Sequence, residues 1–239
     1  MSNDRIVLVS GDGHVSGRPD DYRPHMDRLA LEHFEDYLED YTTKMAEYER
    51  FSTDDGVYGT KGMEQADRDG AIRAGGWSGA WDAQKRLEEM DREGIAGEVL
   101  FLGSHTSMEP FFSPSNRETA LDVRMAGLQA HHRFVAAHIA GTGGRLLPIA
   151  DTAGVDMDAI CAELRWCKEQ GFGGVQMPGL SADPVLPPLY DEWYEQFWAT
   201  CVELGFVVQL HAGWGFLGHG RKFVDPGALM MDPSVGVRV

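Results

Sequence analysis

The sequence lacks several features that define large classes of proteins. No apolar stretch approaches the length needed to cross a bilayer, and residues 1–5 lack the pattern of a signal peptide. Positive charge is also scarce, because 21 Lys and Arg residues stand against 38 Asp and Glu residues, for a formal net charge of −17. Nucleic-acid binding requires clustered Lys and Arg, so we expect neither nucleic acid nor membrane as a partner. An acidic chain is compatible with a cation cofactor.

Cysteine is nearly absent as well. The three cysteines, Cys161, Cys167 and Cys201, are odd in number and lack the spacing of a metal site. All three fall in segments that we expect to be helical. We interpret them as reduced, buried thiols, which predicts a cytoplasmic protein.

The glycine-rich turn of a dinucleotide-binding fold is missing too, because Gly11-Asp12-Gly13-His14 follows the first predicted strand. Strand and helix patterns alternate along the rest of the chain, and glycine follows several helices, which predicts an α/β fold with a parallel sheet. We expect strands at 5–10, 95–102, 145–150, 173–177 and 206–210, and helices at 84–93, 119–140, 156–170 and 191–204. Five strands could form an open doubly wound sheet or most of a (β/α)₈ barrel.

The 239 residues suffice for one domain, 1–239, with a long insertion or lid at about 16–80 that includes helical patterning near 26–50. Two strands of this domain deliver metal-ligand side chains at their C-terminal ends, where α/β enzymes build active sites. Asp12 and His14 follow the first strand, and His211 follows the fifth. Asp12 and His14 are two positions apart, so on extended backbone they point the same way. These three residues predict a divalent-metal site.

A family resemblance rests on five segments in a fixed order. They are Ser10-Gly11-Asp12-Gly13-His14, residues 86–95 (RLEEMDREGI), residues 145–150 (RLLPIA), residues 171–176 (GFGGVQ), and residues 188–193 (PLYDEW) followed by 209–213 (QLHAG). Over nearly its whole length the chain resembles the amidohydrolase-related family, a group that includes aminocarboxymuconate-semialdehyde decarboxylase. The resemblance implies a (β/α)₈ barrel with one divalent metal, zinc or manganese, held by Asp12, His14 and His211.

The chain departs from the family pattern in three places. Relatives carry strands six to eight, which supply a catalytic His and a metal-binding Asp, whereas this sequence ends at Val239. We therefore expect about five βα units of a barrel, with exposed apolar edges on the first and fifth strands. Many relatives have Glu-Pro where this chain has Ser16-Gly17. Strand four ends without the Lys that bridges two metals in binuclear members, which favours one metal.

Other residues are weaker candidates for substrate binding. His105 could enter the mouth of the barrel, although a surface loop is the competing interpretation. Gln176 could offer a neutral hydrogen-bonding group, and Trp77 could line an aromatic pocket, although core packing is its default role. Asp151 follows strand three and could line the pocket or cap a turn. His131, His132 and His138 fall on a helix away from the strand ends, so we expect structural or solvent-facing roles.

Two functions of different classes remain open at this stage. The first is a metal-dependent enzyme that hydrolyses, or decarboxylates without oxidation, a small carboxylated or aromatic substrate. The second is a catalytically incompetent partial barrel that binds metal weakly or not at all. A homodimer is compatible with either function, and an open-sheet protein that binds small anions is a third, weaker hypothesis.

Overall fold

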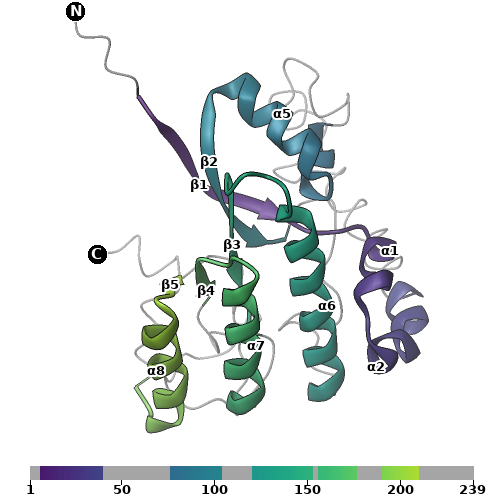
Figure 1. Cartoon of the computed structure of the whole chain (residues 1–239). Helices are drawn as coiled ribbons and strands as arrows, with labels where there is room; N and C mark the ends of the chain where they lie inside the picture. Colours follow the sequence, from purple (N-terminus) through teal and green to yellow (C-terminus); the bar gives the residue numbers. More distant parts are fainter. Residues whose placement is uncertain (1–5, 40–75, 104–119, 153–155, 177–189, 210–239) are drawn as a thin grey trace, which may run out of the picture.

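The computed structural model describes residues 6–39, 76–103, 120–152, 156–176 and 190–209. Its centre is a parallel sheet of five strands in the order β1-β2-β3-β4-β5 (Figure 1). The strands are β1 (Leu8–Val15), β2 (Ile95–Leu102), β3 (Leu146–Ala150), β4 (Gly174–Gln176) and β5 (Val207–Gln209).

This strand order decides between the two folds that the sequence left open. A doubly wound sheet reverses its strand order and places helices on both faces, whereas a barrel adds each strand beside the one before it. Here each strand pairs in parallel with the next strand along the chain. The described strands and helices therefore form a half-barrel, which confirms the predicted fold class.

Several helices begin or end at local signals in the sequence. They are α1 (Pro19–Tyr22), α2 (Arg28–Glu32), α5 (Ala83–Glu93), α6 (Leu121–Ile139), α7 (Met157–Glu169) and α8 (Glu195–Leu204), with short 3₁₀ turns η1 (Arg23–His25), η2 (Gly76–Ala80) and η3 (Glu192–Tyr194). The Asp82 and Asp156 side chains accept backbone hydrogen bonds at the starts of α5 and α7. Gly94 and Gly205 end α5 and α8 in the left-handed conformation that glycine adopts without strain.

The core lies between the sheet and α6, α7 and α8, which stand side by side along it (Figure 1). Leu100, Leu146 and Val175 point from three strands into this layer and are buried. The predicted apolar stripe on the last helix is confirmed, since Phe197 and Cys201 are buried and Trp193 packs against the core. All three cysteines are free and buried.

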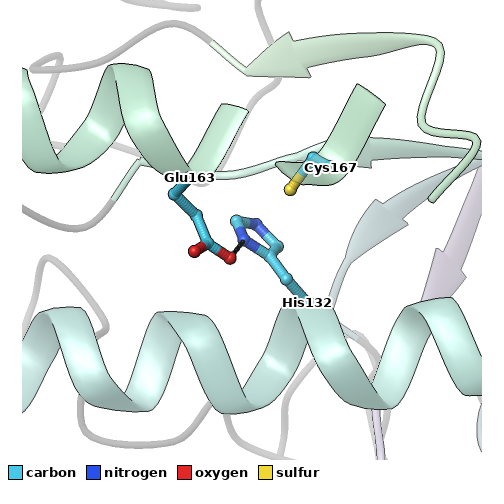
Figure 2. A group of neighbouring side chains, drawn as sticks. All are labelled: His132, Glu163 and Cys167. Carbon is cyan, nitrogen blue, oxygen red and sulfur yellow. Dashed lines mark hydrogen bonds and ion pairs between the residues drawn. The ribbon is translucent and has the colours of Figure 1, made fainter. Parts of the chain in front are cut away.

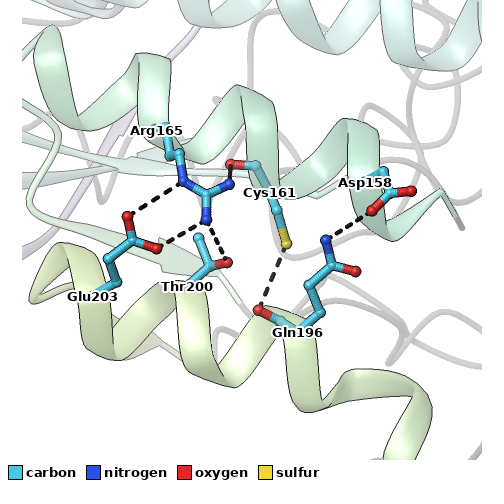
Figure 3. A network of polar contacts seen from close by, with 6 residues as sticks. All are labelled: Asp158, Cys161, Arg165, Gln196, Thr200 and Glu203. Atoms are coloured by element: carbon cyan, nitrogen blue, oxygen red, sulfur yellow. Dashed lines mark hydrogen bonds and ion pairs between the residues drawn. The ribbon is translucent and has the colours of Figure 1, made fainter.

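Polar contacts join α7 to α8 at the surface beside this core (Figure 3). The Arg165 guanidinium donates to Glu203 Oε2 at 2.9 Å and to Thr200 Oγ1 at 3.5 Å. One turn earlier on α8, Gln196 Nε2 donates to Asp158 Oδ1 at 2.8 Å. The two helices are thus held in register by side chains as well as by apolar packing.

The two outer strands are much less covered than the three inner ones. Leu8 and Val9 of β1 are exposed, Leu8 to 51%, as are Ile6 and Val7 just before the strand, and Val207 of β5 is 57% exposed. The apolar edges expected on the first and fifth strands are therefore present. Among the described residues, no helix is both long enough and apolar enough to cross a membrane.

Candidate active site

The Asp12-Gly13-His14 segment lies inside β1, not after it as predicted. Strand β1 runs to Val15, and its pairing with β2 passes from Ser10↔Glu98 to Gly13↔Leu100. The three residue positions from Ser10 to Gly13 on β1 therefore pair with only two positions on β2. The extra residue forms a β-bulge at Gly11 and Asp12. Bulges re-aim side chains and are common beside active sites. The prediction of the strand end was wrong because the two glycines resemble a turn, whereas the bulge lets the strand continue.

Asp12 and His14 share one face of β1, as their spacing predicted. His14 Nε2 lies 3.6 Å from Asp12 Oδ1. Two ligands of one tetrahedral ion, each bound at about 2.0–2.2 Å, lie about 3.3–3.6 Å apart. This carboxylate and this imidazole therefore fit a single divalent ion.

The His14 ring is fixed by its other nitrogen. His14 Nδ1 lies 3.1 Å from the carbonyl oxygen of Leu102, which can only accept a hydrogen bond. Nδ1 therefore carries a proton, and Nε2 is directed toward Asp12. Histidines that bind metals commonly donate their second N–H to a backbone carbonyl in this way.

Alternation along the strands places further polar groups on the same face of the sheet. Val15, Val175 and Val208 pack on the helix side, so their neighbours His14, Gln176 and Gln209 point to the opposite, inner face. Gln176 ends β4, pairs in register with Gln209, and is buried. Within the described part of the chain, neither atom of its side-chain amide has a hydrogen-bond partner. Gln176 is thus a buried amide on the inner face, at the end of the sheet where β1 carries His14.

A partly buried ion pair lies behind this motif, and its residues were not among the predicted site residues. Arg86 of α5 donates to Glu98 of β2 at 2.7 Å, and the Glu98 carboxylate lies against Gly13. The sequence does contain a sign of this pair, which is a lone Glu within an otherwise apolar strand. Because an unpaired carboxylate is costly to bury, such a Glu implies a positively charged or hydrogen-bonding partner.

The structure does not test the remaining predicted ligands and binding residues. His105 and His211 lie outside the described residues. Trp77 falls in η2, but its side chain is not described. Asp151 follows β3 and is buried, which leaves both of its predicted roles, pocket lining and turn capping, untested.

A second group of potential metal ligands lies on the helix side of the sheet (Figure 2). It consists of His132 on α6 with Glu163 and Cys167 on α7, all buried, with their ligand atoms within 4.8 Å of one another. His132 Nε2 accepts the Asp151 N–H at 3.0 Å, so Nδ1 carries the proton and donates to Glu163 Oε1 at 3.0 Å. Arg133 also donates to Glu163 Oε1, at 2.5 Å.

These contacts favour a structural network over a metal centre. Both His132 nitrogens are engaged, and the Arg133 guanidinium already provides a positive charge beside Glu163 Oε1. Burial raises the pKa of the Cys167 thiol well above its ordinary value, and the Glu163 carboxylate raises it further. Burial also raises the pKa of Glu163, but hydrogen bonds and charge from His132 and Arg133 outweigh it, and the net pKa is lowered. The expected structural role of His132 is supported, whereas a solvent-facing position for His131, His132 or His138 is wrong, because all three are buried.

Similarity to known proteins places the chain in a family. No curated protein matches the chain significantly. Among solved structures, the chain is similar to a probable 2-pyrone-4,6-dicarboxylic acid hydrolase from Acinetobacter baumannii with citric acid bound. The identity is 15% and the TM-score 0.42, over 87% of this chain and 50% of that one. The chain thus spans half the length of that structure.

The family model for amidohydrolases matches residues 21–232. The match covers α5, all strands from β2 to β5, and the helices between them. It begins after Asp12 and His14, so the motif on β1 is an observation independent of it. On the extent of this match, the chain belongs to the amidohydrolase family.

Proposed function

We propose that this chain carries the metal-binding part of an amidohydrolase-family enzyme acting on a small carboxylated or aromatic substrate. Asp12 and His14 would hold one divalent metal together with His211. Zinc is the metal that a carboxylate and imidazoles most often bind, and manganese is the alternative. The family match supports a hydrolase or decarboxylase type of enzyme.

The single observation that carries this proposal is the state of His14. Its Nδ1–H is committed to the Leu102 carbonyl, and its Nε2 faces Asp12 Oδ1 at 3.6 Å. The imidazole and the carboxylate thus lie at the separation expected of two ligands of one ion. Asp12 and His14 lie on an edge strand, on the face that the helices leave open.

Groups on the inner face can be assigned roles in the proposed reaction. When bound, the metal supplies a Lewis acid that polarises a substrate oxygen or bound water. The Gln176 amide can both donate and accept hydrogen bonds, so it can orient a substrate carboxylate or carbonyl. The Phe101 ring, whose centroid lies 6.4 Å from that of His14, is buried and provides an apolar neighbour for the imidazole. Hydrolysis and non-oxidative decarboxylation both use these elements.

The test is metal binding by the purified chain. Zinc or manganese affinity is measured by competition with a chromogenic chelator, for the wild type and for His14→Ala, Asp12→Asn and His211→Ala. Each variant should lose most of the affinity. His33→Ala is the matched control, because His33 is exposed on another element, and it should bind as the wild type does. Wild-type affinity in His14→Ala would refute the site.

A second candidate function follows from the exposed strands. The apolar residues of β1 and β5 that face solvent belong to a sheet that the described residues do not close. The chain could therefore bind metal without turnover. A metal-reconstituted chain assayed with aromatic acids, esters and lactones distinguishes the two. The partial-barrel hypothesis predicts turnover lower by several orders of magnitude than in full-length relatives, since each general acid or base contributes about 10²–10⁴-fold. Comparable turnover that His211→Ala abolishes would reject it.

A further inference from the structure

We propose that Arg86 and Glu98 form a positioning pair that holds the bulged Asp12-Gly13-His14 segment from behind, and that Gly13 is glycine to admit the Glu98 carboxylate. This inference rests on the proposed function, because it assigns a role to residues that act through Asp12 and His14. Neither Arg86 nor Glu98 is proposed to touch metal or substrate.

Gly13 leaves room for the Glu98 carboxylate beside β1. It is buried, and its side-chain direction is that of Val15, toward the helix side of the sheet. A Cβ built on Gly13 would collide with the carboxylate of Glu98. The Glu98 carboxylate therefore packs directly against the backbone between the two proposed ligands. Any larger residue at position 13 would displace either Glu98 or the bulge.

Arg86 contacts three acceptors from three elements. Its Nε donates to the Gly79 carbonyl of η2 at 2.7 Å, and its Nη1 donates to Glu98 Oε2 at 2.7 Å. Its Nη2 donates to the backbone carbonyl of His14. A planar guanidinium can satisfy three such acceptors at once, whereas a lysine ammonium cannot reproduce the fork.

Strand β1 needs a hydrogen-bond partner of the kind that Arg86 provides. A bulged edge strand has disrupted pairing on one side and unpaired backbone groups on the other. The Val15 carbonyl accepts from Gly103 N–H, on the β2 side. Neighbouring carbonyls of a strand point to opposite sides, so the His14 carbonyl points away from β2, where Arg86 meets it. Arg86 thus supplies to β1 a hydrogen bond that a further strand would otherwise provide.

The ion pair between Arg86 and Glu98 is shielded from most of the solvent, which strengthens it. The Arg86 and Glu98 side chains are only 11% and 12% exposed, so solvent screens them far less than a surface pair. His14 is thereby fixed twice, through its carbonyl by Arg86 and through its ring by Leu102. We infer that this double fixation sets the separation between Asp12 Oδ1 and His14 Nε2.

The experiment compares Glu98→Gln and Arg86→Lys with the wild type and with Glu203→Gln. Glu203→Gln is the matched control, because it makes the same chemical change in a surface ion pair far from β1. Two quantities are measured: zinc affinity by chelator competition, and hydrogen exchange of the backbone amides at 12–15 in metal-free protein. Arg86→Lys keeps the charge beside Glu98 and removes the fork, so it remains informative if Glu98→Gln fails to fold.

We expect both variants to lose about 10–100-fold in zinc affinity, the usual effect of removing a residue that supports a metal ligand. Exchange at 12–15 should be faster in both, while Glu203→Gln matches the wild type in both measurements. Wild-type zinc affinity in either folded variant would overturn the inference. If the wild type itself binds no zinc, the proposed function fails, and unchanged exchange at 12–15 in the variants would then overturn the positioning role separately.

Discussion

The middle of the sheet and its first strand are built in different ways. Strands β2, β3 and β4 send Leu100, Leu146 and Val175 into a layer closed by α6 and α7, and these side chains are almost inaccessible. The first half of β1 carries equally apolar side chains that face solvent. Apolar sequence alone therefore does not stabilise β1. Its position depends on the burial of Val15 near its C-terminal end, on one pairing with β2 and on the polar contacts around Arg86.

Under the proposed function, the centre of this half-barrel provides stability and its edge provides the metal ligands. The centre provides apolar burial, the dominant favourable contribution to folding. The edge provides a carboxylate and an imidazole on an open face, where a ligand can reach them.

The same substitution should have very different costs in the two regions. Leu164 of α7 is fully buried, so Leu164→Ala should lower the free energy of unfolding by about 2–5 kcal/mol through lost burial and a cavity. Leu8 of β1 is half-exposed, so Leu8→Ala should cost less than about 1 kcal/mol. Urea denaturation of the two variants measures both values. Equal costs would show that β1 is as well packed as the centre.

Acid should lower the free energy of unfolding through His138, which lies at the end of α6 where the two regions meet. Burial, and then the charge of Arg86, lowers the pKa of His138 from its ordinary 6.5 to about 4. The unfolded chain therefore binds this proton at a higher pH than the folded protein does. Stability is complete above about pH 6.5 and falls as the pH drops toward 4, by up to about 3 kcal/mol from this group.

Burial, and then His132, also lowers the pKa of His131, which adds to the loss with the same sign. The measurement is the urea midpoint between pH 7.5 and pH 4.5. His138→Gln should flatten its pH dependence, whereas the exposed His33→Gln should not. A wild-type slope in His138→Gln would exclude His138 as a source of the acid sensitivity.

Within the centre, the polar contact between α6 and α7 should matter less than apolar burial. Glu163→Gln removes the charge that His132 and Arg133 share while keeping the shape of the side chain. We expect a loss of about 1–3 kcal/mol, because the buried His132 N–H then has only a neutral acceptor. Zinc affinity should not change if the His132 group is structural. A loss of zinc affinity with the fold intact would instead locate a metal at this group.

The smallest effect is expected on the surface of α7 and α8. Arg165 and Glu203 form a well-aligned ion pair, yet both are exposed to solvent. Glu203→Gln should leave the thermal unfolding midpoint unchanged within error at physiological salt, because exposed pairs are screened and cost side-chain entropy. A clear drop in this midpoint would mean that the network of Figure 3 contributes more than its exposure suggests.

Features that depend on residues close together in the sequence were predicted accurately, whereas features that depend on distant contacts were not. Strand β2 was predicted residue for residue, because Gly94 and Gly103 bound it with local backbone signals. The start of α7 was predicted to within one residue, since Asp156 caps it. In both places the information lies within a few residues of the boundary.

The site required information from far along the chain. The sequence paired Asp12 with His14 correctly, because strand periodicity is local. It could not show that β1 continues through Gly13, since the partner that Gly13 accommodates is Glu98 of another strand. The contact from His132 to the Asp151 N–H was missed for the same reason. Helical periodicity places His132 on α6 but does not say what α6 packs against.

The bulged pairing of β1 with β2 also has a consequence for how the protein folds. The His14–Leu102 contact joins residues 88 positions apart, whereas Ile149 and Gly174 pair across less than a third of that separation. The longer closure costs about 1 kcal/mol more in chain entropy. Contacts of long sequence separation form slowly, so β1 should dock after β3, β4 and their helices have assembled. The proposed metal ligands would then be the last part of the half-barrel to reach their native geometry.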